Sequence, residues 1–145
     1  MLAKLSLAVL VLLSHSSQAA VAEDLMTSIP GMGLFNTYKA YSGYLDGRQD
    51  DKGNVNVHLH YVFIESQDSP ADDPVLIWFN GGPGCSSMLG FAGENGPYVN
   101  EDGTQGFVKN PWPWNKRANV LYLEMPGGVG YSYVDNPELL KTDDL

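Results

Sequence analysis

The sequence has little positive charge, a single cysteine and no long apolar run. Its 145 residues carry 8 Lys and Arg against 17 Asp and Glu, which gives a formal net charge of −9. This balance excludes nucleic acid as a partner, because phosphate binding depends on clustered Lys and Arg. No basic amphipathic stretch of the kind that lies on a membrane surface is present. The apolar run from Leu5 to Leu13 is shorter than the roughly 20 residues that a membrane-spanning helix needs.

The N-terminal residues have the pattern of a secretory signal peptide. Lys4 precedes the apolar run, and a polar patch and then small residues, Ala19 to Ala22, follow it. We expect residues 1–22 to be the signal peptide and residues 23–145 the mature chain, with Ala19 as the alternative cleavage point. The protein is then expected to enter the secretory pathway and to have no membrane association after cleavage.

Cys85 is the single cysteine of the chain, which is unusual for a secreted protein because the secretory pathway favours disulfides. Three explanations stay open: its partner is absent from this sequence, it pairs with another molecule, or it is a free buried thiol.

The histidines are also few: His15, His58 and His60. His58 and His60 lie two apart in a segment of alternating polarity, where we expect them on a solvated face. No further His or Cys joins them, so neither a metal nor any other cofactor is expected.

Alternating and continuous apolar segments predict an α/β sheet. Residues 54–64 alternate, as in an antiparallel strand near a sheet edge, and residues 75–79 and 119–124 are short apolar runs typical of strands buried on both faces. A helix is expected over residues 86–93, and Pro137 suits the first turn of another. This order of elements is typical of the opening of an α/β domain.

A glycine-rich loop, residues 80–87, follows the strand at 75–79 directly. Gly81 and Gly82 leave their backbone N–H groups uncovered, and Pro83 stiffens the loop, so the segment can bind a negatively charged oxygen. The phosphate-binding pattern requires a Lys that is missing here, and the dinucleotide pattern is not matched. From spacing alone, an ordinary tight turn stays an equal alternative.

The loop residues resemble the hallmark segment of the serine carboxypeptidases, secreted peptidases with the α/β-hydrolase fold. The resemblance covers nearly the whole mature chain and includes these segments: Ile29–Gly31, Tyr41–Leu45, Trp78–Ser87, Glu94–Pro97, Asn110–Pro111, Trp114–Lys116, Ala118–Pro126 and Gly128–Tyr133. It implies that the chain is the N-terminal portion of such a sheet and that the whole protein removes C-terminal residues from peptides through an acyl-enzyme.

The resemblance also implies roles for individual residues. Gly82 would donate its N–H to the oxyanion of the tetrahedral intermediate, and Asn80 with the Gly81 N–H would hold the C-terminal carboxylate of a peptide or protein substrate. Glu94 would pair with a second Glu next to the family's nucleophile and share protons with the substrate carboxylate. Trp78 would support Glu94 or, as an equal alternative, only pack in the core. Binding would then be best in acid, which suits a lysosome or vacuole as well as the extracellular space.

For Cys85 the resemblance implies a disulfide whose partner lies farther along the family's chain. The family's Gly-x-Ser-x-Gly nucleophile motif is missing from these 145 residues, and all three histidines precede the glycine-rich loop. We therefore expect no Ser-Asp-His triad of the family's order, no activity from this chain alone, and an open apolar edge on the strand at residue 119.

Two alternatives share the same recognition groups. One is a serine carboxypeptidase-like acyltransferase, in which an alcohol replaces water as acceptor. The other is an inactive secreted remnant that binds peptide C-termini. Oligomeric state and side-chain preference do not follow from the sequence.

Overall fold

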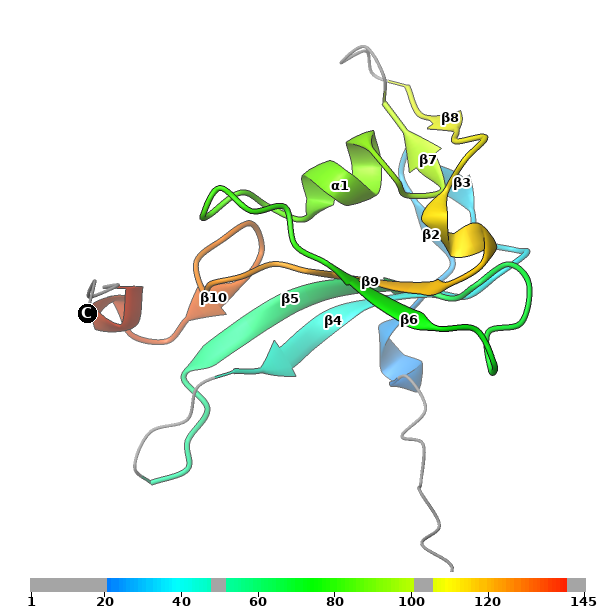
Figure 1. Cartoon of the computed structure of the whole chain (residues 1–145). Coiled ribbons are helices and arrows are strands. Elements are labelled where there is room, and N and C mark those ends of the chain that lie inside the picture. The colour runs from blue at the N-terminus through cyan, green and yellow to red at the C-terminus, as the bar shows by residue number, and fades with distance from the viewer. Residues whose placement is uncertain (1–20, 48–51, 101–105, 141–145) are drawn as a thin grey trace, which may run out of the picture.

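A computed structural model describes residues 21–47, 52–100 and 106–140, and its centre is a six-stranded sheet (Figure 1). The main path of the sheet runs β1 (Leu25–Met26), β4 (Ala40–Asp46), β5 (Val57–Ile64), β9 (Asn119–Leu123) and β6 (Val75–Trp78), and β10 (Tyr133–Val134) also pairs with β5. Of the described pairs in this sheet, β6 with β9 is parallel and the others are antiparallel.

Smaller elements complete the described part of the chain. They are the hairpins β2 (Ser28–Ile29) with β3 (Gly33–Leu34) and β7 (Tyr98–Val99) with β8 (Val108–Lys109), the helix α1 (Met88–Gly93), and the 3-10 helices η1 (Ala22–Asp24), η2 (Trp114–Lys116) and η3 (Pro137–Leu140). The strands expected from sequence and the helix after the glycine-rich loop are thus confirmed with shifted ends. The predicted signal peptide lies outside the described residues except for Val21 and Ala22.

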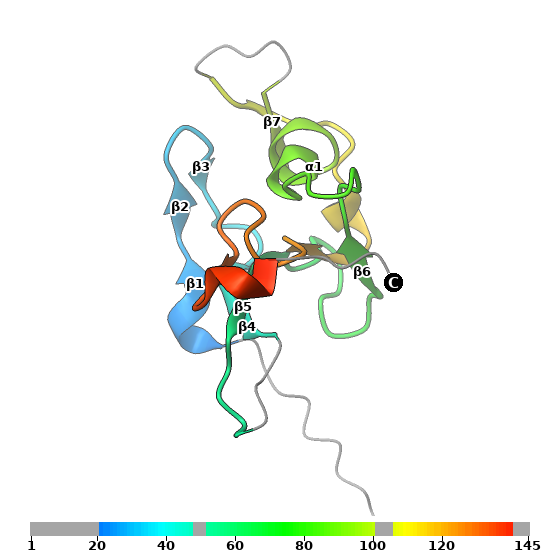
Figure 2. The same ribbon diagram turned by 90° about the vertical axis from the view of Figure 1, so that its left-hand side faces the viewer.

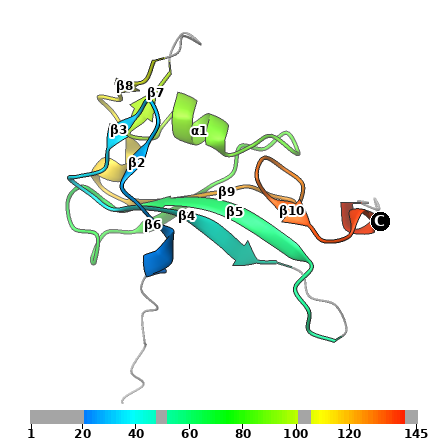
Figure 3. The ribbon, with the colours of Figure 1, turned by 180° about the vertical axis from the view of Figure 1, so that it is seen from behind.

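Helix α1 and both small hairpins cover the same face of the sheet, as the front and rear views agree (Figures 1 and 3). Side chains alternate between the two faces of a strand, so every second residue of β5 points toward α1. The buried core on this face joins β4, β5, β9 and α1 through Ala40, Val62, Ile64, Phe91, Val120 and Tyr122. The sequence-based expectation of an α/β arrangement is confirmed.

Strand β5 lies in the middle of the sheet, which corrects the prediction that it runs near an edge with one wet face. It pairs with β4 on one side and with β9 and β10 on the other. Its inner face includes His60, Val62 and Ile64, and His60 is only 8% exposed. Val62 and Ile64 lie on the same face of the strand as the histidines, and α1 and the β2–β3 hairpin cover that face. The histidine is therefore buried rather than solvated.

Strand β6 forms the open edge of the described sheet, at the side opposite β1 (Figure 2). Val75 and Ile77 are exposed although they were expected to be buried, because no described strand pairs with the far side of β6. The strand expected to have the open edge, β9, has neighbours on both sides, β5 and β6. The sheet therefore has an exposed apolar edge, as predicted, but the strand at that edge is β6 and not β9.

Candidate functional site

The glycine-rich loop leaves β6 at the end where the parallel strand β9 also ends. Gly81, Gly82 and Gly84 have φ values of 77°, 115° and 90°, in the left-handed region that side chains disfavour. At Gly82 there is little room as well, since a Cβ there would lie 3.0 Å from Cys85 Sγ. Glycine is therefore required at these positions by the shape of the loop.

The backbone amides of Gly81 and Gly82 have no protein acceptor among the described residues. The carbonyl of Gly81 does take part in the loop, since it accepts from the Cys85 N–H at 3.1 Å. All the loop residues from Gly81 to Cys85 are exposed. Two adjacent unpaired N–H groups on an exposed loop can bind an oxygen with negative charge.

Trp78 orients Asn80. Its indole N–H donates to Asn80 Oδ1 at 3.1 Å, and its ring packs edge-on against Trp114 with 5.2 Å between centroids. Trp78 was expected either to support Glu94 or only to pack in the core; the hydrogen bond of its indole in the structure goes to Asn80. The bond holds the Asn80 side chain through its oxygen, and the amide nitrogen is left to donate.

Glu94 follows α1 directly and is exposed. Its backbone is held by two bonds: its N–H donates to the Gly90 carbonyl at 3.1 Å, and its carbonyl accepts from Asn110 Nδ2 at 3.3 Å. No partner of its carboxylate is found in the described part of the chain, so the group is available to a ligand.

Cys85 is a free, exposed thiol. This overturns one of the three alternatives, the free buried thiol, and leaves the other two. The loop turns the side chain toward solvent rather than into the core, because the core contacts at this point are made by Ser87 and α1.

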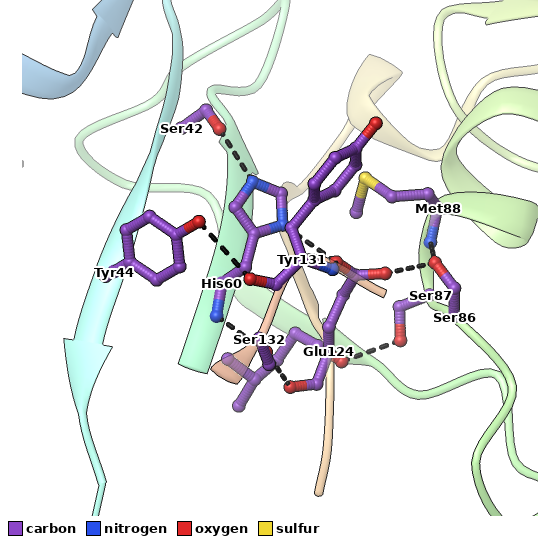
Figure 4. Close-up of polar contacts among 10 residues, drawn as sticks. Ser42, Tyr44, His60, Ser86, Ser87, Met88, Glu124, Tyr131 and Ser132 are labelled. Atoms are coloured by element: carbon purple, nitrogen blue, oxygen red, sulfur yellow. Dashed lines mark hydrogen bonds and ion pairs between the residues drawn. The ribbon is translucent and has the colours of Figure 1, made fainter. Parts of the chain in front are cut away.

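A buried polar cluster that sequence reasoning missed lies where β9 ends (Figure 4). Glu124 is fully buried, and its carboxylate accepts from the hydroxyl of Ser86 and, at 2.8 Å, from the N–H of Tyr131. Oε2 of Glu124 also lies 2.9 Å from Nδ1 of His60. Ser132 Oγ links the backbones of His60 and Glu124, because it accepts from the His60 N–H and donates to the Glu124 carbonyl. The cluster ties the glycine-rich loop to the segment after β9.

Comparison with known proteins identifies the family and the fold of the chain. The family model described as serine carboxypeptidase matches residues 30–145. The crystal structure of a prohormone-processing carboxypeptidase from Saccharomyces cerevisiae superposes with a TM-score of 0.58 at 30% identity, over 81% of this chain and 24% of that one. The sheet is accordingly the N-terminal part of an α/β-hydrolase sheet, which confirms the fold class predicted from the sequence.

Curated relatives are more similar still. The lysosomal protective protein of Mus musculus is 41% identical over 139 residues, which are 94% of this chain and 28% of that protein. A serine carboxypeptidase of Caenorhabditis elegans is 51% identical over 112 residues, 77% of this chain and 19% of the relative. The chain belongs to the serine carboxypeptidase family, and it spans between about a fifth and about a quarter of the length of these relatives.

Within the described residues, no helix is long and apolar enough to cross a membrane. Groups of three or more potential metal-binding side chains are not found there either.

Proposed function

We propose that this chain supplies the oxyanion loop and the carboxylate-recognition groups of a serine-type carboxypeptidase. Gly82 donates its N–H to the oxyanion that forms during attack on the last peptide bond. The N–H of Gly81 and the amide of Asn80 hold the C-terminal carboxylate of the substrate. One such donor to an oxyanion commonly contributes about 2.7–4 kcal/mol to the stability of the transition state.

The observation that carries the proposal is the pair of unpaired amides at Gly81 and Gly82, beside an Asn80 side chain held by Trp78. Groups at the carboxyl ends of strands are where α/β sheets place their ligands, and this loop leaves such an end. Glu94 approaches the substrate carboxylate with its own carboxyl, and two carboxyls in contact share a proton. Binding is therefore expected to strengthen in acid, as in a lysosome, a vacuole or an acidic extracellular space.

The family's Gly-x-Ser-x-Gly nucleophile motif is not among these 145 residues, so peptide hydrolysis by this site requires a nucleophile that the printed sequence does not contain. An acyltransferase would use the same loop with a different acceptor, and no described contact favours it. A remnant that only binds peptide ends would also use the same groups.

Calorimetric titration tests the recognition part of the proposal. The full chain is titrated at pH 5 with a short peptide that has a free C-terminal carboxylate and with the same peptide as its C-terminal amide. We expect binding of the first only, and loss of that binding in Asn80→Ala. Asn36→Ala, which changes an exposed asparagine on another segment, is the matched control. Equal binding of the acid and the amide, or none of either, would remove the proposal.

A further inference from the structure

Three side chains on neighbouring strands form a continuous hydrogen-bonded line that the proposed peptidase site does not use (Figure 4). Ser42 Oγ of β4 lies 2.9 Å from Nε2 of His60 of β5. Nδ1 of the same ring lies 2.9 Å from Oε2 of Glu124, just after β9. A hydroxyl on one ring nitrogen and a carboxylate on the other is the arrangement that activates serine for nucleophilic attack.

The chemistry of the partners assigns the protons in this line. The Glu124 carboxylate already accepts from the Tyr131 N–H and the Ser86 hydroxyl, so we assign it as the acceptor here too, with the hydrogen on Nδ1 of His60. In the neutral ring Nε2 is then an acceptor, and the Ser42 hydroxyl donates to it. Nε2 is therefore positioned to remove the proton of Ser42 Oγ, as a general base does.

The imidazole is held firmly. Glu124 is fully buried, and its carboxylate also accepts from the Tyr131 N–H and the Ser86 hydroxyl. The rings of Tyr44 and Tyr131 stand edge-on to the His60 ring, with centroids 5.6 Å and 5.2 Å away. Fixed partners on both nitrogens and aromatic rings beside the imidazole give the preorganisation that a catalytic base needs.

A pocket of about 490 Å³ opens beside Ser42 and His60. The rest of its lining is mainly apolar, from Met26, Ile29, Met32, Met88 and Phe91. A volume of this size accommodates a small ligand, and an apolar lining favours an aliphatic or aromatic group. His60 is the only imidazole among the lining residues, and its Nε2 lies within hydrogen-bond distance of the Ser42 hydroxyl.

We propose that Ser42, His60 and Glu124 form a second nucleophilic site, which cleaves small activated esters whose apolar acyl group enters this pocket. Ser42 Oγ attacks the ester carbonyl carbon while His60 Nε2 takes its proton. The bond between carbonyl carbon and leaving oxygen then breaks, and His60 returns the proton to that oxygen. Water attacks the acyl-Ser42 ester with His60 as base, and the proton passes back to Ser42 Oγ as the carboxylic acid leaves.

The pocket of this site is separate from the free amides of the glycine-rich loop, although Ser86 of that loop donates to Glu124. None of the residues from Asn80 to Cys85 lines the pocket, so the amides of Gly81 and Gly82 do not serve an intermediate formed on Ser42. Activated esters are therefore the fitting substrates, since they need less oxyanion stabilisation than peptide bonds do. The chain order Ser, His, Glu also differs from the order Ser, Asp, His that the family resemblance implies.

Covalent labelling tests the proposal. The full chain is treated with an alkyl fluorophosphonate, in which Ser42 Oγ displaces fluoride at phosphorus, and the labelled peptide is identified by mass spectrometry. Hydrolysis of p-nitrophenyl butyrate is followed in parallel. We expect the label on Ser42, loss of both labelling and hydrolysis in Ser42→Ala, and a labelling rate at least about 100-fold lower in His60→Gln.

Two matched controls isolate the effect. His58→Gln removes the neighbouring histidine of the same strand, which pairs with Asp135, and Ser69→Ala removes a hydroxyl that donates to Asp72. Both should label at the wild-type rate, and circular dichroism checks that each variant is folded. Absence of label on Ser42 in the folded wild-type chain overturns the proposal, whatever the variants do. So does an unchanged labelling rate in folded His60→Gln, because the hydroxyl would then not be activated by the ring.

Discussion

The α-carbon of Gly130 lies against the carboxylate of Glu124, and a Cβ at position 130 would overlap Oε1. Gly130 also has a φ of 56°, in the left-handed region. The segment after β9 can thus fold back over Glu124, with the Tyr131 N–H on the carboxylate, only because position 130 has no side chain.

Gly130→Ala is therefore expected to lower the free energy of unfolding by about 3 kcal/mol or more, the sum of left-handed strain and overpacking. Gly53→Ala is the matched control, since Gly53 has a φ of 83° but nothing within 4 Å of the added Cβ. It should cost only the strain, about 1–2 kcal/mol. Urea unfolding of both variants measures the difference, and equal losses would show that Glu124 moves aside at no cost.

Removal of the buried Glu124 carboxylate is expected to lower the free energy of unfolding as much as Gly130→Ala does. In Glu124→Ala the ring of His60, the Tyr131 N–H and the Ser86 hydroxyl all lose their acceptor, and loss of one partner of a buried pair costs about 3–5 kcal/mol. Glu23→Ala, which changes an exposed carboxylate, should alter stability by less than about 0.5 kcal/mol. Thermal unfolding compares the two; similar melting temperatures would contradict the role given to Glu124.

Gly90 on α1 allows Trp78 to reach Asn80. A Cβ at position 90 would overlap the Trp78 indole nitrogen, so Gly90→Ala is expected to push the ring away and break its bond to Asn80. Peptide affinity at pH 5 should then fall about 10-fold, the loss expected for one hydrogen bond of typical net strength. Gly93→Ala, which meets nothing within 4 Å, is the control. Unchanged affinity in a folded Gly90→Ala variant would show that Trp78 does not contribute to peptide recognition.

Alkaline pH should destabilise the fold through Tyr122. Burial raises the pKa of Tyr122 above its ordinary value near 10, and its hydroxyl donates to Asn95 Oδ1 at 2.8 Å. The folded state thus binds the phenolic proton more tightly than the unfolded state does. Its contribution to stability is complete below pH 10 and is lost progressively above it.

Urea midpoints measured from pH 8 to pH 11 should therefore fall less steeply in Tyr122→Phe than in the wild type. The variant should also be less stable by about 1–3 kcal/mol at pH 8, because Asn95 Oδ1 loses its donor. Parallel pH profiles of the two proteins would contradict the assignment.

The open edge at β6 should cause self-association. Ile77 is 55% exposed on an unpaired apolar strand, and charged residues, Lys above all, are what natural edge strands use to prevent pairing. Ile77→Lys is expected to shift sedimentation toward the monomer. Val108→Lys, at a residue of 53% exposure on β8, should leave the association unchanged. An equal response to both would assign the association to general surface hydrophobicity.

The sequence predicts well where local chemistry decides the structure. The turn after β6 follows from glycines that adopt left-handed φ values, and the strand at Asn119–Leu123 follows from its apolar run. Burial is harder to predict, since it depends on neighbours: Val75 and Ile77 have the composition of a central strand but lie at an edge.

The buried cluster depends on register, which the sequence does not state. Ser42 and Glu124 are 82 positions apart and meet His60 only because β5 pairs with β4 on one side and β9 on the other. A signal was present nonetheless: Val62 and Ile64 share the face of His60, and aliphatic residues at those positions indicate a covered face.

The position of β9 also constrains how the protein is made. Strand β9 separates β5 from β6, although both are translated more than 40 residues before its first residue, Asn119. While a ribosome is still adding those residues, the nascent chain must keep two apolar strands apart with nothing between them. Chaperone contact is to be expected over that interval of synthesis, while the place of β9 between β5 and β6 is empty.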